Sequence, residues 1–252
     1  MKDKLQLNYR QTFYIGCAFF TIMLLWQVYN YMCPLFLEEM GINDTYKGLI
    51  MAGDNIFALV MLPIFGTLSD KSKTKLGRRI PYITVGTILA AFTFPFVAAF
   101  GINGNIIGLL ITMGLILFFM NIYRAPAVAL MPDLTPKNHR SKANGIINLM
   151  GGIGGIFAYG TALLFGSKHP LIPFIVTSIL MILALIILLT TINEAKILAQ
   201  INQDEEIRDE QNNSHPINKL QKSNLLFILC TVFFCSQCSR NILGHIFLGH
   251  FL

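Results

Sequence analysis

Charge is scarce in this sequence. Only 13% of its 252 residues are charged, whereas ordinary soluble chains carry roughly 25%. Hydrophobic residues make up 54%, including 20 Phe. This composition argues against a soluble protein. The net charge of +6 comes from short basic blocks between long apolar runs, so it indicates membrane topology rather than a nucleic-acid surface, and no nucleic-acid partner is expected.

Cysteine is also rare and offers no disulfide framework. The five Cys are an odd number, and all lie in apolar runs, unlike the even sets of small secreted domains. Enzyme motifs are missing as well: the sequence has no His/Glu metal box, no nucleophile paired with a base and no phosphate-binding Gly loop. We therefore expect no enzyme, no catalytic residue, no metal site and no cofactor other than a coupling ion.

Long apolar runs are what the chain has in abundance. A bilayer core about 30 Å thick is crossed by about 20 apolar helical residues, and seven segments reach that length. The first is too long for a signal-peptide core and has no cleavage site after it, so it is interpreted as a retained helix. The seven segments are Phe13–Leu37, Gly48–Leu68, Ile80–Phe100, Ile106–Met131, Ala143–Phe165, Leu171–Ile192 and Leu225–Leu252. The sequence predicts an all-α, multi-pass protein of the lipid bilayer.

Basic residues alternate between the two sides of these segments. Fifteen Lys and Arg lie in the N-terminus and in the second, fourth and sixth loops, whereas only Lys47 and Lys168 lie on the other side. Because Lys and Arg are retained on the cytoplasmic side, we expect a protein of the cell membrane with a cytoplasmic N-terminus.

The chain divides into three predicted parts. Residues 1–192 form a six-helix transmembrane bundle, residues 193–224 form a polar cytoplasmic linker of mixed charge, and residues 225–252 form a seventh helix. A lone helix after a central linker is what a chain cut early in its second half would show, so a fragment is one expectation.

The second loop has a specific polar pattern. Gly66 allows a neighbouring helix to approach closely, and Asp70, one turn later, is a carboxylate that can bind guanidinium groups. Gly77 permits a tight turn, and Arg78-Arg79 follow directly before the third helix. The plainer interpretation is positive-inside anchoring with an acidic helix end.

The whole string is more specific than its parts. From Gly66 to Pro81 it resembles the loop pattern of the major facilitator superfamily, in the longer form of the glycoside–pentoside–hexuronide cation symporters and the sucrose transporters. The end of the fourth helix and its loop resemble the same family in the residues Asn121, Arg124, Pro126, Pro132, Asp133 and Arg140.

The resemblance implies an N-terminal bundle of two three-helix repeats, forming half of a twelve-helix transporter that works by alternating access. It also implies a missing C-terminal half or a second chain as partner. The residues expected to form a cytoplasmic gate that exchanges ion pairs are Gly66, Asp70, Gly77, Arg78, Arg79, Asp133 and Arg140.

Two charges lie inside predicted membrane helices, Asp54 in the second and Arg124 in the fourth. Such groups are expensive in hydrocarbon and are usually functional. Counted from opposite helix ends, both fall in the middle third of the membrane, so we expect them to lie close together and to face a central cavity. A structural ion pair without a transport role is the alternative.

The first helix supplies further polar residues. Gln27, Asn30 and Tyr31 fall on adjoining faces, and amides and aromatic rings suit sugar hydroxyls and ring faces. Together with Asn121 they are predicted to line the substrate path, although interhelical hydrogen bonding explains them equally well.

The predicted function is therefore secondary active transport of a small solute, a sugar or glycoside, in symport with H⁺ or Na⁺. The alternative is a non-transporting scaffold or regulatory protein derived from a truncated transporter. A membrane enzyme is a distant third.

Overall fold

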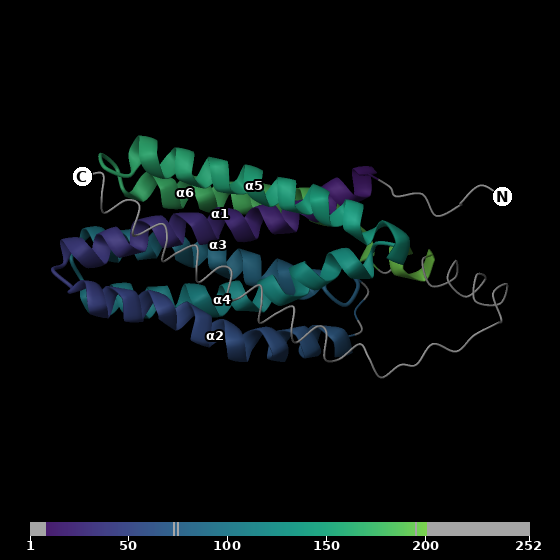
Figure 1. The fold of residues 1–252 in the computed structure, drawn as a ribbon, viewed down its shortest axis with the longest axis horizontal. Helices are drawn as coiled ribbons and strands as arrows, with labels where there is room; N and C mark the ends of the chain where they lie inside the picture. The colour runs from purple at the N-terminus through teal and green to yellow at the C-terminus, as the bar shows by residue number, and fades with distance from the viewer. Residues whose placement is uncertain (1–8, 73, 75, 195, 201–252) are drawn as a thin grey trace. The chain divides into compact units, whose positions relative to one another are not determined.

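The computed structural model describes residues 9–72, 74, 76–194 and 196–200 and consists there of six long helices (Figure 1). They are α1 (Tyr9–Glu39), α2 (Asp44–Lys71), α3 (Ile80–Ile102), α4 (Ile106–Asp133), α5 (Arg140–Phe165) and α6 (Leu171–Thr191), with a 3₁₀ turn at Lys137–His139. All six are long and apolar enough to cross a bilayer. The all-α membrane fold is confirmed, while the predicted seventh helix lies outside the described residues.

Short-range signals set the helix ends. The side chain of Asn43 accepts a hydrogen bond from the backbone N–H of Thr45 at the start of α2, and that of Asn105 accepts one from Gly108 at the start of α4. Such caps satisfy backbone donors that the first turn leaves free. These two starts lie at the end of the bundle that is opposite the α2–α3 loop.

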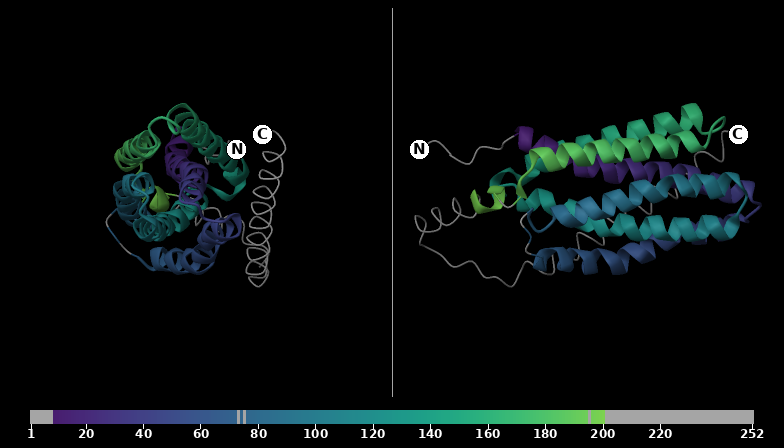
Figure 2. Two further views of the ribbon diagram at one scale, coloured as in Figure 1. Left: turned by 90° about the vertical axis from the view of Figure 1, so that its left-hand side faces the viewer. Right: turned by 180° about the vertical axis from the view of Figure 1, so that it is seen from behind.

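The packing of the helices shows two interlocked repeats (Figure 2). The first helix of one repeat, α1, packs mainly against α5 and α6 of the other. In the same way α4 packs mainly against α2 and α3, and α3 also packs against α6. This exchange is the arrangement of two related three-helix units, as the sequence predicted.

Helix α1 is the most buried of the six, but one stripe along it stays partly exposed. The spacing of three and four residues places the members of this stripe on one helix face. We call them the α1 stripe: Met23, Trp26, Gln27, Asn30, Tyr31 and Pro34. Because the other faces of α1 pack into the bundle, the stripe marks the side on which the polar residues of α1 remain accessible.

Candidate substrate path and charge cluster

Asp54 is turned into the bundle. Helix α2 buries only three described side chains, and Asp54 is one of them, with 4% of its surface exposed. The rest of α2 presents apolar residues outward, such as Leu49, Ile56 and Leu59. Burying a carboxylate instead of an apolar group is unfavourable unless another charge compensates it, so this placement calls for a partner.

The partner is Arg124 of α4. The two side chains are near enough to interact electrostatically, but they form no direct ion pair, and the guanidinium of Arg124 instead lies over the ring of Trp26 at 4.5 Å. A cation over an indole face is attracted to the electron-rich ring. Asp54 Oδ1 is buried and has no hydrogen-bond partner among the described residues. The structure thus places the two membrane-embedded charges within electrostatic range of each other, without a direct ion pair between them.

Tyr29 extends this group from α1. It lies one turn beyond Trp26, is 1% exposed and interacts electrostatically with Asp54. Its hydroxyl is also buried without a hydrogen-bond partner in the described part of the chain. The sequence analysis missed Tyr29 because an aromatic residue in an apolar run gives no sign of which way it points.

On its other side, the α1 stripe contacts helix α5. The Tyr159 hydroxyl donates a hydrogen bond to Gln27 Oε1 over 3.0 Å. The rings of Tyr31 and Tyr159 make an edge-to-face contact with their centroids 6.1 Å apart. Gln27, Asn30 and Tyr31 all lie half-exposed on the stripe, so the three residues predicted on α1 share one accessible face.

Asn121 is placed differently from the other predicted path residues. It is 3% exposed, and its amide donates to the carbonyl of Leu117 one turn earlier in α4. The bond stays within its own helix, so Asn121 is buried in the bundle rather than presented on the accessible face. Its Oδ1 has no partner among the described residues.

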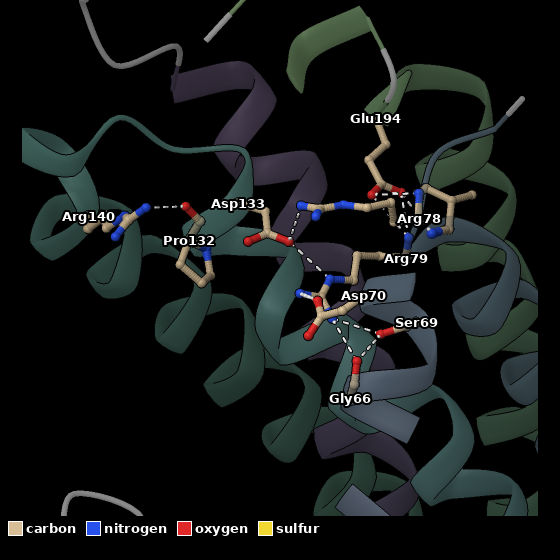
Figure 3. Close-up of polar contacts among 10 residues, drawn as sticks. Gly66, Ser69, Asp70, Arg78, Arg79, Pro132, Asp133, Arg140 and Glu194 are labelled. Carbon is tan, nitrogen blue, oxygen red and sulfur yellow. Dashed lines mark hydrogen bonds and ion pairs between the residues drawn. The ribbon is translucent and has the colours of Figure 1, made fainter. Parts of the chain in front are cut away.

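A second polar group lies at the end of the bundle that carries the α2–α3 loop, and Figure 3 shows it. We call it the charge cluster: Asp70, Arg78, Arg79, Asp133 and Glu194. Arg79 is its centre and is 5% exposed. Its Nε donates to Asp133 Oδ2 at 2.9 Å, and Nη1 donates to Ser69 Oγ at 2.7 Å. Nη2 pairs with Asp70. One guanidinium thereby ties the end of α2 to the end of α4.

Arg78 shares the same acceptor. Its Nη2 lies 3.3 Å from Asp133 Oδ2, so one carboxylate of α4 receives both arginines that precede α3. Charge-assisted hydrogen bonds of this kind are stronger than neutral ones. Their strength increases further where water is excluded, as it is around the buried Arg79. Within the described bundle Arg79 thus pairs with both Asp70 and Asp133, and Arg78 pairs with Asp133.

Glu194 is the member of this cluster that the sequence analysis missed. Oε1 accepts from the backbone N–H groups of Arg78 and Arg79 at 2.9 and 3.0 Å. Oε2 accepts from those of Arg79 and Ile80 at 2.8 and 3.0 Å. A carboxylate at a helix N-terminus satisfies free donors and complements the helix dipole. Glu194 is 0% exposed, although it falls in the stretch predicted as linker.

Gly77 makes this contact possible. Its φ of 115° lies where side chains are strained, and a Cβ there would approach Glu194 Cβ to 2.6 Å. The predicted tight turn is confirmed, with Gly77 N–H donating to Thr74 O at 3.1 Å. Gly77 is thus needed both for the turn and for the space that Glu194 occupies.

Two other predicted roles need correction. No described atom lies within 4 Å of a Cβ built on Gly66, so Gly66 does not mediate close packing within the described bundle, because this part of α2 is uncovered. It contributes its carbonyl instead, which accepts from Ser69 Oγ at 2.8 Å. Arg140 donates to the carbonyls of Pro132 and Thr135 at 2.8 and 3.4 Å. It caps the end of α4 rather than pairing with an acidic residue of the cluster.

These features define a class: a multi-pass helical membrane protein with an embedded charge pair between α2 and α4 and a charge cluster where those helices end. The model of the Major Facilitator Superfamily matches residues 15–249. The chain therefore belongs to the Major Facilitator Superfamily.

Curated relatives point to a more specific group. The chain is 25% identical over 153 residues to Sucrose transport protein SUC3 of Arabidopsis thaliana, covering 53% of this chain and 26% of the relative. It is 28% identical over 167 residues to Proton-associated sugar transporter A of Homo sapiens, covering 61% and 22%. With Sucrose transport protein SUT2 of Oryza sativa subsp. indica it shares 26% over 172 residues, covering 60% and 34%. The matched stretch is thus at most about a third of each of these relatives' length.

Proposed function

We propose that this chain contributes the N-terminal, path-forming bundle of a sugar transporter driven by a cation gradient across the cell membrane. The observation that carries the proposal is Asp54, the one embedded carboxylate of a helix that buries only three described side chains. A buried carboxylate opposite an arginine can bind and release a cation, because the positive charge of the arginine stabilises the carboxylate after the cation has left. The relatives named as sucrose and sugar transporters support a sugar as solute.

In this proposal the Asp54–Arg124 pair is the coupling site. A proton or Na⁺ that binds Asp54 neutralises its charge and weakens the attraction that holds Arg124. Arg124 is then free to donate hydrogen bonds to solute hydroxyls, since guanidinium groups are strong donors. The α1 stripe supplies Gln27, Asn30 and Tyr31 for the same solute. Binding of cation and solute is thereby linked through one arginine.

The charge cluster is proposed as the cytoplasmic gate. Arg79 joins the ends of α2 and α4, and Glu194 joins the segment that follows α6 to the start of α3. Rearranging the bundle at this end requires some of these buried bonds to break. Each buried charge left without a partner costs free energy, so the cluster favours the conformation in which it is complete. The N-terminus is cytoplasmic in this proposal, as the distribution of Lys and Arg predicts.

The direct test is solute uptake by the full chain reconstituted in liposomes. We expect accumulation of radiolabelled sucrose under an inward proton or Na⁺ gradient, and the gradient that drives it identifies the coupling ion. Asp54→Asn and Arg124→Gln should each reduce accumulation at least about tenfold, because one removes the cation site and the other its partner. The matched control is Asp44→Asn, on the same helix with a side chain 89% exposed, which should retain uptake.

Unchanged uptake in both embedded variants would show that the pair is structural. No uptake by the unaltered chain under either gradient would favour the alternative of a non-transporting membrane protein.

A further inference from the structure

The strongest feature outside the coupling pair is the contact between α5 and the α1 stripe. Tyr159 of α5 donates through its hydroxyl to Gln27 Oε1, and its ring meets Tyr31 edge-to-face. Resting on the proposed function, we infer that Tyr159, Gln27 and Tyr31 form a binding subsite for the sugar ring. Tyr159 is the specificity-determining residue of this subsite.

The chemistry of the three side chains fits a polyhydroxylated ring. Gln27 keeps its two amide N–H donors available while its carbonyl accepts from Tyr159, and the Tyr159 oxygen can still accept one hydrogen bond. Two tyrosine rings at an angle of 83° present aromatic faces on which the C–H face of a sugar can pack. Hydroxyl groups and an apolar ring face are thus both matched within one contact.

The exposure of the Tyr159 and Gln27 side chains distinguishes this contact from ordinary packing between helices. Tyr159 is 42% exposed, and Gln27 lies half-exposed on the stripe. An amide and a phenol that faced hydrocarbon would be unfavourable, because neither finds enough partners there. Tyr159 lies six residues, or about 9 Å, before the end of α5. Polar groups left accessible at this depth indicate a surface that meets water or solute.

The backbone leaves room beside Gln27. Gly155 lies one turn before Tyr159 on α5, and a Cβ built there would come no closer than 3.8 Å to Gln27 Cγ. The side of Gln27 that faces α5 is therefore lined by a residue without a side chain. On the α4 side Arg124 lies over Trp26, another member of the stripe, so the subsite and the coupling pair both contact helix α1.

The chain carries its own probe for this subsite. Trp26 is its single tryptophan and directly precedes Gln27. We would titrate the full chain in lipid nanodiscs with sucrose, follow the emission of Trp26, and measure binding of radiolabelled sucrose by equilibrium dialysis as an independent readout. Tyr159→Phe should weaken sucrose binding about 3- to 10-fold through loss of the hydroxyl. Tyr159→Ala should weaken it about 10- to 100-fold, because the ring is lost too.

Phe157→Leu is the matched control. Phe157 also lies on α5 and contacts α1 edge-to-face through Phe20, with centroids 6.3 Å apart, but it has no polar group. This variant should bind sucrose as the unaltered chain does. Thermal unfolding of every variant shows whether an effect arises from loss of packing between α1 and α5.

The outcomes separate the subsite from the function on which it rests. If the unaltered chain binds sucrose and Tyr159→Phe and Tyr159→Ala bind it equally well, the subsite is refuted and sugar transport still stands. A lowered unfolding temperature with unchanged affinity also refutes it, since Tyr159 is then only a packing residue. If the unaltered chain binds no sucrose by either readout, both the subsite and a sucrose-type solute are refuted.

Discussion

The contact of Glu194 with the start of α3 makes a quantitative prediction. Glu194→Ala removes the acceptor for three backbone N–H groups, and two of these belong to the buried residues Arg79 and Ile80. Hydrogen bonds to a charged group contribute about 1.5–3 kcal/mol each, and a buried donor without a partner carries a desolvation cost. Counting only the two buried donors, we expect a loss of about 3–5 kcal/mol in the free energy of unfolding.

The charge and the hydrogen bonds can be separated with a second variant. Glu194→Gln keeps one carbonyl oxygen as acceptor but removes the charge at the helix N-terminus, which is worth up to about 2 kcal/mol when partly buried. For chains of 150–250 residues 1 kcal/mol corresponds to about 2–4 °C in Tm. Thermal unfolding in detergent should therefore show a decrease of about 6–20 °C for Ala and about 2–8 °C for Gln. Glu38→Ala, at an exposed Glu at the end of α1, should change Tm little.

A substitution at Gly77 tests the Glu194 contact independently. Gly77→Ala forces a side chain into φ 115° and against Glu194, so it should displace the same carboxylate. The double variant Gly77→Ala/Glu194→Ala should then cost clearly less than the sum of the single variants, by about 1–3 kcal/mol. Additive losses, or a Glu194→Ala protein that unfolds within about 1 °C of the unaltered chain, would refute the view that Glu194 holds this end of the bundle together.

Two further predictions follow from helix packing and topology. Gly86→Ala should destabilise the chain by about 2 kcal/mol or more in thermal unfolding, because its Cβ would come within 2.9 Å of the backbone nitrogen of Tyr123. Gly114→Ala is the control: no described atom lies within 4 Å of its Cβ, so this variant should be neutral or stabilising. In intact cells a membrane-impermeant maleimide should label Lys168→Cys, and it should label Lys142→Cys only after permeabilisation, if the basic loops are cytoplasmic; the opposite pattern would reverse the proposed orientation. Both positions are exposed in the structure, so access to the reagent is limited by the membrane alone.

The fold could be predicted from the sequence because its main signals are local. Apolar length defines a membrane span. The described helices α1 to α5 each contain one predicted segment, and α6 ends one residue before its segment does. The approximate depth of Asp54 and Arg124 also follows from counting residues along helices, since each residue adds 1.5 Å. Their proximity also requires that α2 and α4 are neighbours and turn these faces toward each other. The repeat arrangement provides the first, and the burial of Asp54 shows the second.

The contacts that sequence reasoning missed all depend on orientation or on distant backbone. Glu194 binds N–H groups of residues more than 110 positions earlier in the chain, and backbone donors have no residue type that a pattern could reveal. Its place directly after an apolar segment, in a row of mixed charge, made a linker the natural interpretation. Tyr29 and Tyr159 were missed because aromatic residues are common in membrane helices.

Helices α2 and α4 each carry one of the two embedded charges and one acidic residue of the charge cluster. On α2, Asp54 and Asp70 are 16 residues or about 24 Å apart, and on α4, Arg124 and Asp133 are nine residues or about 13 Å apart. Two of the three side chains that α2 buries are polar, Asp54 and Ser69, and Ser69 accepts a hydrogen bond from Arg79, so polar interactions contribute to holding α2 against the bundle. A change of charge at Asp54 and a change of pairing at Arg79 therefore both act on the interface between α2 and α4, one along the helices and one at their ends. This shared interface explains why a helix so poor in buried apolar groups holds charge at both places.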